Sequence, residues 1–329
     1  MVVSQPTHHG PQLAEHPRDD NRDDTTAWPS VCVVIPTHNR PELVRAAIAS
    51  VLGQDYAGTI EIVVVFDRSE PDHTLARQGD DRAVRVIHNV RTPGLAGSRN
   101  SGILSARADI VAFCDDDDQW LPLKLSRQVS LLQTSPDCEM TSTSIVIDFE
   151  GRSIVRLAGQ DRVTYAELLR SRKSMLHSSG FVFRRDALIE GIGLIDEDTP
   201  RSMAEDWDIL LRAARRRPIL HIDEPLVRVR WGPTSFFAND WQVRNEARLW
   251  MLAHHPDIAR DRKGFGLTHG KLAFGHAMLG QRRQAVREAL LAASRNPLEP
   301  RLYLALLVAA RVLPGQRVVN ALNRRGHGI

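Results

Sequence analysis

Short apolar runs alternate with longer amphipathic segments in the first half of the chain. Four runs have the composition of buried strands: "VCVVI" at 31–35, "IEIVVVF" at 60–66, "VRVIHN" at 84–89 and "DIVAFC" at 109–114. The segments "PELVRAAIASVLGQ", "GSRNSGILSARA" and "LPLKLSRQVSLLQ" have helical spacing, the first with Pro41 near its first turn. Repeated strand–helix–strand units of this kind predict an α/β fold, with a mostly parallel sheet flanked by helices on both faces.

The second half changes character twice. Strand-like "MTSTSIVIDF", "GFVFRR" and "PLVRVRW" surround the helical "EDWDILLRAARR", so this part should extend the sheet and form the second wall of a cleft. After Trp241 the pattern is continuously helical, and "GKLAFGHAMLGQRRQAVREALLAASRNP" resembles one tetratricopeptide-like hairpin, although ordinary helical packing explains it equally well. The resulting division is a disordered leader (1–29), a mixed α/β domain (30–240, with halves 30–135 and 136–240) and a helical C-terminal extension (241–329).

Composition narrows the class of protein. The 329 residues are 42% hydrophobic and 25% charged, and a net charge of +3 is too weak a bias for a dedicated nucleic-acid binder. Cys32, Cys114 and Cys138 form no CxxC pair, so we expect buried thiols in a reducing, cytoplasmic compartment. The longest apolar stretch, "LYLALLVAA", is about half the ~20 residues of a spanning helix. We therefore expect no membrane span.

Four consecutive aspartates, Asp115 to Asp118, follow the strand-like "DIVAFC". Adjacent carboxylates repel one another, and burial makes ionising each of them costlier, so a cation would relieve the strain. Solvated loop or helix-capping residues are the alternative, because Asp bonds readily to nearby backbone groups. Ligands of parallel sheets bind at the carboxyl ends of the strands, and Asp67 ends the strand "IEIVVVF" in the same way. This placement favours a site over a loop.

Three known site types do not fit. "GLAGSRNSGI" lacks the GxGxxG dinucleotide fingerprint, and the chain has no GxxxxGK[ST] phosphate loop. An EF-hand beginning at Asp115 would need Gly and Glu where Trp120 and Ser126 stand. The dehydrogenase and nucleotide-kinase interpretations therefore lose their main support, and the calcium-loop interpretation fails.

The ordered motifs "VVIPTHNR", "VVVFD", "GLAGSRNSGI", "AFCDDDDQWLP", "SGFVFRRDAL" and "EDWDILLR" together resemble the family-two inverting glycosyltransferases of GT-A fold, over roughly residues 30 to 240. The resemblance implies a Rossmann-like sheet and transfer of a sugar from a nucleotide-diphosphate donor, with Mn²⁺ or Mg²⁺ as cofactor. It implies a donor such as a UDP- or TDP-sugar and a glycan, lipid-linked or small-molecule acceptor, in glycan or polysaccharide assembly. It implies no nucleic-acid partner.

The same resemblance assigns roles to donor-binding residues. Asp67 would accept the imide N–H of uracil or thymine, and its alternative is a turn residue. Asp115 and Asp117 would form the DxD pattern, with Asp117 as the direct metal ligand and Asp116 or Asp118 touching sugar hydroxyls. Mg²⁺ commonly combines one or two carboxylates with substrate phosphates. The other residues implied in nucleotide binding are Pro36, Thr37, Asn39, Arg40, Arg99 and Asn100.

The acceptor half carries the implied general base. Asp206 matches the family position for taking the acceptor's proton, and a favourable charge at a helix N-terminus is its structural alternative. Glu205, three residues after Ser202, fits a capping box and would mainly cap the helix. Ser179 and Gly180 would line the sugar site, and Arg230 or Trp231 would lie near the diphosphate, although "WGPTS" departs from the family pattern. Asp208 would be a surface or helix-start charge.

Two other functions share some of these features. A sugar nucleotidyltransferase would need an N-terminal Gly-, Arg- and Lys-containing signature loop, which the chain lacks, and a non-catalytic binding module has no need of the DxD carboxylates and Asp206. The basic helices of 241–329 predict either peripheral contact with an anionic membrane or a helical cap on the core. The localisation implied is the cytoplasm, with contact at the inner membrane face.

Overall fold

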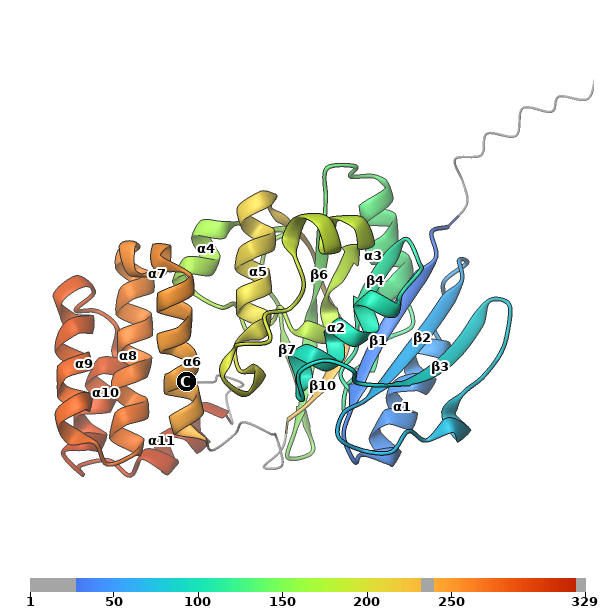
Figure 1. Ribbon diagram of the computed structural model, residues 1–329. Helices are drawn as coiled ribbons and strands as arrows, with labels where there is room; N and C mark the ends of the chain where they lie inside the picture. Colours follow the sequence, from blue (N-terminus) through green and yellow to red (C-terminus); the bar gives the residue numbers. More distant parts are fainter. Residues whose placement is uncertain (1–27, 232–239, 324–329) are drawn as a thin grey trace, which may run out of the picture.

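The computed structural model describes residues 28–231 and 240–323, which form one large sheet with helices on both faces and a helical array at one end (Figure 1). All but the last two residues of the predicted leader lie outside the described residues. The order along the sheet is β3-β2-β1-β4-β9-β6-β10-β5. The strands are β1 (Val31–Thr37), β2 (Ile60–Phe66), β3 (Arg82–His88), β4 (Ile110–Phe113), β5 (Gln119–Trp120), β6 (Met140–Phe149), β7 (Arg152–Arg156), β8 (Arg162–Val163), β9 (Val182–Arg184) and β10 (Ile219–Arg230).

Most of the sheet consists of two parallel groups joined by one short strand, while β5, β7 and β8 pair antiparallel with β10 or β6. β3, β2, β1 and β4 run parallel to one another, and β6 runs parallel to β10. Between the groups lies β9, which pairs antiparallel with both β4 and β6. Parallel neighbours need crossover connections, which helices supply here. The predicted α/β class, with a mostly parallel sheet, flanking helices and C-terminal helices, is confirmed.

Successive residues of β1 face opposite layers of helices. Val31, Val33 and Ile35 pack on the side of α1 (Pro41–Leu52) and α3 (Lys124–Gln133). Cys32 and Val34 pack on the side of α2 (Leu95–Ser105), α4 (Tyr165–Arg170) and α5 (Glu205–Arg216). Because strands alternate their side chains, burial on both faces explains their continuous apolar runs. At Gly102 any Cβ would collide with the Val34 side chain, so glycine lets α2 lie close against β1.

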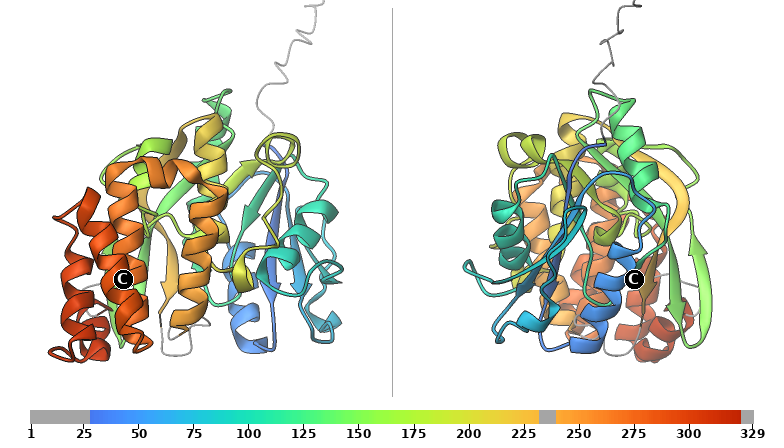
Figure 2. Two further views of the ribbon diagram at one scale, coloured as in Figure 1. Left: turned by 60° about the vertical axis from the view of Figure 1, so that its left-hand side comes forward. Right: turned by 90° about the vertical axis from the view of Figure 1, so that its right-hand side faces the viewer.

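The C-terminal helices stack side by side at the end of the sheet away from β3 (Figures 1 and 2). They are α6 (Trp241–His254), α7 (Pro256–Arg260), α8 (Arg262–Met278), α9 (Arg282–Arg295), α10 (Pro300–Ala309) and α11 (Gly315–Asn323). Trp241 and Phe274 belong to an apolar cluster of their own, whereas Met251 and Ile258 join the core beneath α5. Among the described helices, none is long and apolar enough to cross a membrane. The division at residue 240 stays a prediction.

Candidate active site

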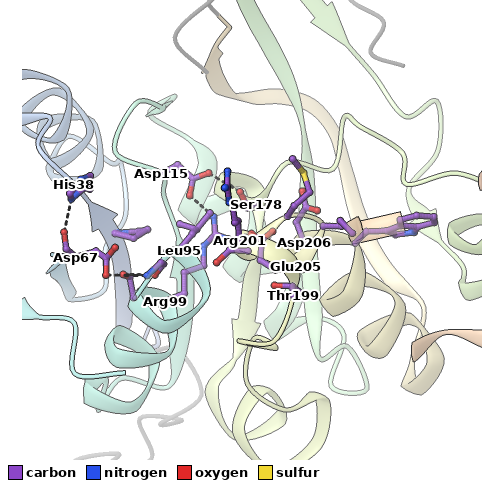
Figure 3. Close-up of a pocket in the computed structure, with 18 of the residues that line it drawn as sticks. His38, Asp67, Leu95, Arg99, Asp115, Ser178, Thr199, Arg201, Glu205 and Asp206 are labelled. Carbon is purple, nitrogen blue, oxygen red and sulfur yellow. Dashed lines mark hydrogen bonds and ion pairs between the residues drawn. The ribbon is translucent and has the colours of Figure 1, made fainter. Parts of the chain in front are cut away.

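A cavity of about 1100 Å³ opens at the carboxyl ends of β1, β2 and β4, and continues between α5 and the C-terminal helices α6 and α8. This is the edge at which open α/β sheets bind ligands. Its size is at the upper end of the range for small-molecule sites, so it has room for two substrates. Figure 3 shows its residues in a row, from His38 and Asp67 through Arg99 and Asp115 to Glu205 and Asp206.

Asp67 forms one end of the row and is 5% exposed. Its carboxylate accepts hydrogen bonds from Asn89 Nδ2 (2.9 Å), the Gly94 backbone N–H (3.1 Å) and Arg68 Nε (2.8 Å). Burial alone would raise the pKa of Asp67, but these three donors lower it below its ordinary value. An ionised, fixed carboxylate at the edge of the cavity can accept a further hydrogen bond from a ligand.

The loop after β1 brings cations and hydroxyls to the aspartate run. Thr37 Oγ1 donates to Asp116 Oδ2 (2.8 Å), and Arg40 Nη1 donates to Asp116 Oδ1 and Asp117 Oδ2, both at 3.0 Å. Pro36 and Asn39 line the cavity beside them. Asn39 lies at φ 53°, in the left-handed region that Asn tolerates better than most residues. The sequence-predicted loop therefore does reach the predicted carboxylates.

Asp115 and Asp118 are held by residues outside the loop after β1, namely Arg99 and the segment 177–179. Asp115 accepts from Arg99 Nη2 (2.5 Å) and Ser178 Oγ (2.9 Å). Asp118, which is 2% exposed, accepts from Ser179 Oγ (2.6 Å) and lies 3.2 Å from His177 Nδ1. Ser179 is itself buried and does not line the cavity, and Gly180 packs against Thr143, so both serve the support of the run.

The run still carries more negative charge than its neighbours neutralise. Burial raises the pKa of Asp116, although Thr37 and Arg40 oppose the shift. Burial and the like charges of Asp118, Asp115 and Asp116 raise the pKa of Asp117 to about 7. For Asp115 burial acts in the same direction, but Arg99 and His177 hold its pKa below the ordinary value. A bound cation would remove this imbalance.

Asp115, Asp118 and His177 each offer a ligand atom, and these atoms lie within 4.8 Å of one another. Two carboxylates and an imidazole suit a divalent transition metal, and the carboxylates also suit Mg²⁺. Asp117, the predicted direct ligand, is outside this group because its carboxylate faces Arg40. His177 was not predicted as a ligand from the sequence, because a single histidine in a polar segment gives no signal until the fold places it beside Asp118.

Arg99 and Glu205 form a buried pair behind Asp115. Arg99 is 1% exposed, and its guanidinium donates to both Asp115 and Glu205. It was predicted to brace base, ribose or phosphate, but its described contacts are with these carboxylates, although it still lines the cavity. The pKa of Glu205 is raised by burial, against the opposing influence of Arg99.

The predicted capping role of Glu205 is wrong. The N-cap of α5 is Ala204, at φ 69°, and no side chain caps the helix. Ser202 Oγ instead accepts the Ala96 backbone N–H at 3.1 Å. Arg201, Ser202 and Ala204 all adopt positive φ immediately before α5. Such strain in non-glycine residues is found most often at functional sites, and here it directs Glu205 and Asp206 toward the cavity.

Asp206 lies next to Glu205 and is 17% exposed as a side chain. Its carboxylate forms an ion pair with Arg172 Nη2. Burial lowers the pKa of Arg172. Asp208, predicted to be a surface or helix-start charge, is buried and pairs with Arg212 (2.7 Å) and His255 (2.8 Å). At the start of α5 the cavity is thus lined by Glu205 and Asp206, and not by Asp208.

One further predicted contact is not found. Asn100 does not line the cavity: its amide donates to Ile195 O (2.8 Å) and Glu197 (2.7 Å) and so fixes the 195–197 loop. Trp120 is 3% exposed, and its indole N–H donates to Ser179 O, which makes it a packing residue. Arg230 and Trp231 do line the cavity, whereas most of "WGPTS" lies outside the described residues.

A family model for glycosyl transferase family 2 matches residues 32–192. Relatives include the Escherichia coli "UDP-Glc:alpha-D-GlcNAc-diphosphoundecaprenol beta-1,3-glucosyltransferase WfgD", 29% identical over 142 residues (43% of this chain, 55% of that protein). The "GalNAc(5)-diNAcBac-PP-undecaprenol beta-1,3-glucosyltransferase" of Campylobacter jejuni is 35% identical over 102 residues (30% and 33%). The match to each of these two relatives thus spans about half of its length or less.

Solved structures share the fold. Staphylococcus aureus TarS 1-349 in complex with UDP-GlcNAc superposes with a TM-score of 0.55 at 20% identity, covering 91% of this chain and 92% of that one. The mannosyltransferase PcManGT of Pyrobaculum calidifontis, in complex with GDP-Man and Mn²⁺, gives 0.52 at 20% identity, covering 88% of each chain. At these identities the likeness extends to the fold alone.

Proposed function

Through residues 32–192 the chain belongs to glycosyl transferase family 2, and we propose that it is a metal-dependent inverting glycosyltransferase. The observation that carries the proposal is the joint lining of one cavity by Asp67, the aspartates 115–118 and Asp206. In this assignment, Asp67 binds the base of a UDP- or TDP-sugar and Asp206 faces the acceptor hydroxyl. Pro36, Thr37 and Asn39 form the loop around the nucleoside.

Asp115 is the carboxylate common to the predicted DxD pair and to the observed group with Asp118 and His177. We assign it as a ligand of Mn²⁺ or Mg²⁺, with the remaining ligands drawn from Asp117, Asp118 and His177. The surplus charge of the run and its oxygen donors fit such an ion. The ion supplies electrostatic stabilisation of the departing nucleoside diphosphate. Arg99 holds Asp115 in place, and Glu205 holds Arg99.

Asp206 acts as the general base. Its carboxylate must be ionised to accept a proton, and the ion pair with Arg172 favours that state. One base and one in-line attack give a single inversion, so an α-linked donor yields a β-linked product. Both relatives described above carry beta-1,3-glucosyltransferase in their names.

The names of those relatives also contain undecaprenol-linked diphosphates. We propose a lipid-linked glycan as the acceptor, and action at the cytoplasmic face of a membrane in polysaccharide assembly. Helices α6 and α8 line one end of the cavity, and we propose that α6–α11 form an extension of the catalytic domain 30–240.

The test is nucleotide binding followed by donor consumption. UDP, TDP or GDP should raise the Tm of the protein in Mn²⁺ or Mg²⁺ and not in EDTA, because a ligand bound only by the native state stabilises that state. A panel of nucleotide-sugars should then show release of one nucleoside diphosphate. Stabilisation that is equal with and without divalent cations would reject metal dependence. Consumption of no donor by a protein that binds nucleotide would reject the activity.

A further inference from the structure

The cavity continues beyond Asp206 to a wall made by the C-terminal helices. Arg244 and Arg248 on α6 and Thr268 and Lys271 on α8 line this wall. Each pair is spaced by one helical turn, so its two side chains lie on the same face of their helix. From the sequence, these helices were predicted either to cap the core or to contact a membrane. None of the four residues was assigned a role.

Thr268 places a buried hydroxyl in this wall. Thr268 is 1% exposed, and its Oγ1 makes no hydrogen bond within the described residues. Buried hydroxyls are nearly always hydrogen-bonded, because leaving one unpaired costs about 1 to 3 kcal/mol. The residue nevertheless lines the cavity. A ligand that reaches this wall would supply the missing partner.

Among the described residues, Arg248 and Lys271 of this wall have no anionic partner. Arg248 Nη1 donates to Asn245 Oδ1 (3.1 Å) and Lys271 O (3.4 Å), and neither acceptor is an anion. Within the described residues, the Lys271 ammonium forms no ion pair. Burial lowers the pKa of Lys271 well below its ordinary value, and Arg248, Arg301, Arg172 and Arg244 lower it further. Burial and the nearby arginines likewise bring the pKa of Arg248 to about 9.

The wall is next to the acceptor end and not the nucleoside end. Arg172, which pairs with Asp206, is also one of the cations that act on Lys271. Asp67 and Asp115 of the donor end lie together on one side of Asp206 in the row of Figure 3, and the wall residues line the same cavity from α6 and α8. An anion bound at the wall would therefore belong to the molecule whose hydroxyl reaches Asp206.

We propose that Thr268, Lys271, Arg248 and Arg244 form a subsite for a phosphate group of the acceptor. Several cations and one hydroxyl converge here, which suits a group with several anionic oxygens. A wall within a cavity is reached by a phosphate on a ligand and not by a flat membrane surface. The identification of the ligand as acceptor rests on the proposed function, whereas phosphate binding at this wall does not.

The experiment uses the full chain saturated with UDP and Mg²⁺, so that the donor end is occupied. Calorimetry then measures the affinity for inorganic phosphate, for α-D-GlcNAc 1-phosphate and for the neutral methyl α-D-GlcNAc. Lys271→Met is compared with Lys263→Met, a change of the same kind at an exposed position on α8. Thr268→Val removes only the unpaired hydroxyl and keeps its volume.

We expect both phosphates to bind and the neutral glycoside not to. Lys271→Met should weaken phosphate binding about 10- to 100-fold, as expected for losing a charged hydrogen-bond partner, and Lys263→Met should not. The Tm of the ligand-free Lys271→Met and Thr268→Val proteins should stay level or rise, because each loses an uncompensated polar group. A role in folding alone would instead lower both values.

The results of these binding measurements either support or overturn the phosphate subsite. Binding of inorganic phosphate alone supports the subsite and locates its specificity in the phosphate. Equal phosphate affinity in Lys271→Met and Lys263→Met, or no phosphate binding by the UDP-saturated protein, overturns it. If no nucleotide binds, the proposed function fails separately, and the comparison of the two lysine variants without UDP still tests the wall.

Discussion

The two ends of the cavity have opposite charge, and their residues come from different parts of the chain. The proposed donor end carries four consecutive aspartates at a strand end, with Arg40, Arg99 and His177 as partners. The proposed acceptor end carries Arg244, Arg248 and Lys271 from two helices outside the family match at 32–192. Burial and neighbouring carboxylates raise the pKa of Asp117 to about 7 at the first end, and burial and neighbouring arginines lower the pKa of Lys271 at the second. The difference suggests that the shared domain binds donor and cation, while the added helices select an acceptor.

Asp206 stands where the two ends meet, and its removal should have the largest effect. Asp206→Asn should lower transfer about 10²- to 10⁴-fold, the usual scale for loss of general-base assistance, while UDP binding persists. Initial rates with saturating donor measure this. Glu205→Gln is the matched neighbour: it weakens the buried contact to Arg99, so it should lower the Tm more than Asp206→Asn does. Near-normal turnover by Asp206→Asn would remove the base assignment.

The metal ligands can be separated within the acidic end. Asp115→Asn should weaken cation-dependent UDP binding by about 100-fold or more, since even residues behind metal ligands cost 10- to 100-fold. Asp117→Asn and Asp118→Asn then distinguish the predicted DxD pair from the observed group with His177. Titration of each variant with Mn²⁺ at fixed UDP gives the affinities. Unchanged Mn²⁺ affinity in Asp115→Asn would contradict both arrangements.

At the nucleoside end, Asp67→Ala should weaken UDP binding by about 1 to 3 kcal/mol, the cost of unpairing a buried polar group. The side chain also accepts from Asn89 and Gly94, so some loss of stability should accompany the change. Calorimetry with UDP and Mg²⁺ makes the measurement. Unchanged affinity would show that Asp67 only closes its turn.

The hydrogen bonds of Glu197, which hold the 195–197 loop, make a pH-dependent contribution to the free energy of unfolding. Hydrogen bonds from Asn100, Thr92 and Arg91 overcome burial and lower the pKa of Glu197 from 4.5 to about 2. A group whose pKa is lower in the folded state stabilises above its unfolded pKa, so this contribution is lost as pH falls from about 4.5 to 2. Glu197→Gln should flatten that part of the stability curve by about 1 to 3 kcal/mol. Denaturant unfolding at several pH values tests it, and an unchanged slope would contradict it.

The sequence predicted the donor end better than the acceptor end for a physical reason. Strand periodicity located β1, β2 and β4, and parallel strands necessarily bring the residues after them to one edge, so Asp67 and Asp115 could be placed together. The Ser202–Glu205 capping pattern failed because Ala204 adopts a left-handed conformation that no local rule signals. The pairing of Arg99 with Glu205 spans 106 positions and arises only from packing.

The wall formed by α6 and α8 could not be predicted from the sequence, because it too arises only from packing. Arg244, Arg248 and Lys271 are ordinary residues of amphipathic helices until α6 and α8 turn them toward one cavity. Charge along a helix usually indicates a solvated face, and nothing in the spacing distinguishes this case.

The most direct test of the account is the stereochemistry of the product. Wild-type protein, Mn²⁺ or Mg²⁺, the α-linked nucleotide-sugar consumed in the donor panel and a phosphate-bearing acceptor are combined, and the anomeric coupling of the new linkage is read by ¹H NMR. We expect a β-linked product, which the Asp206→Asn variant should form only at a strongly reduced rate. An α-linked product would contradict the single-displacement mechanism and, with it, the role of Asp206.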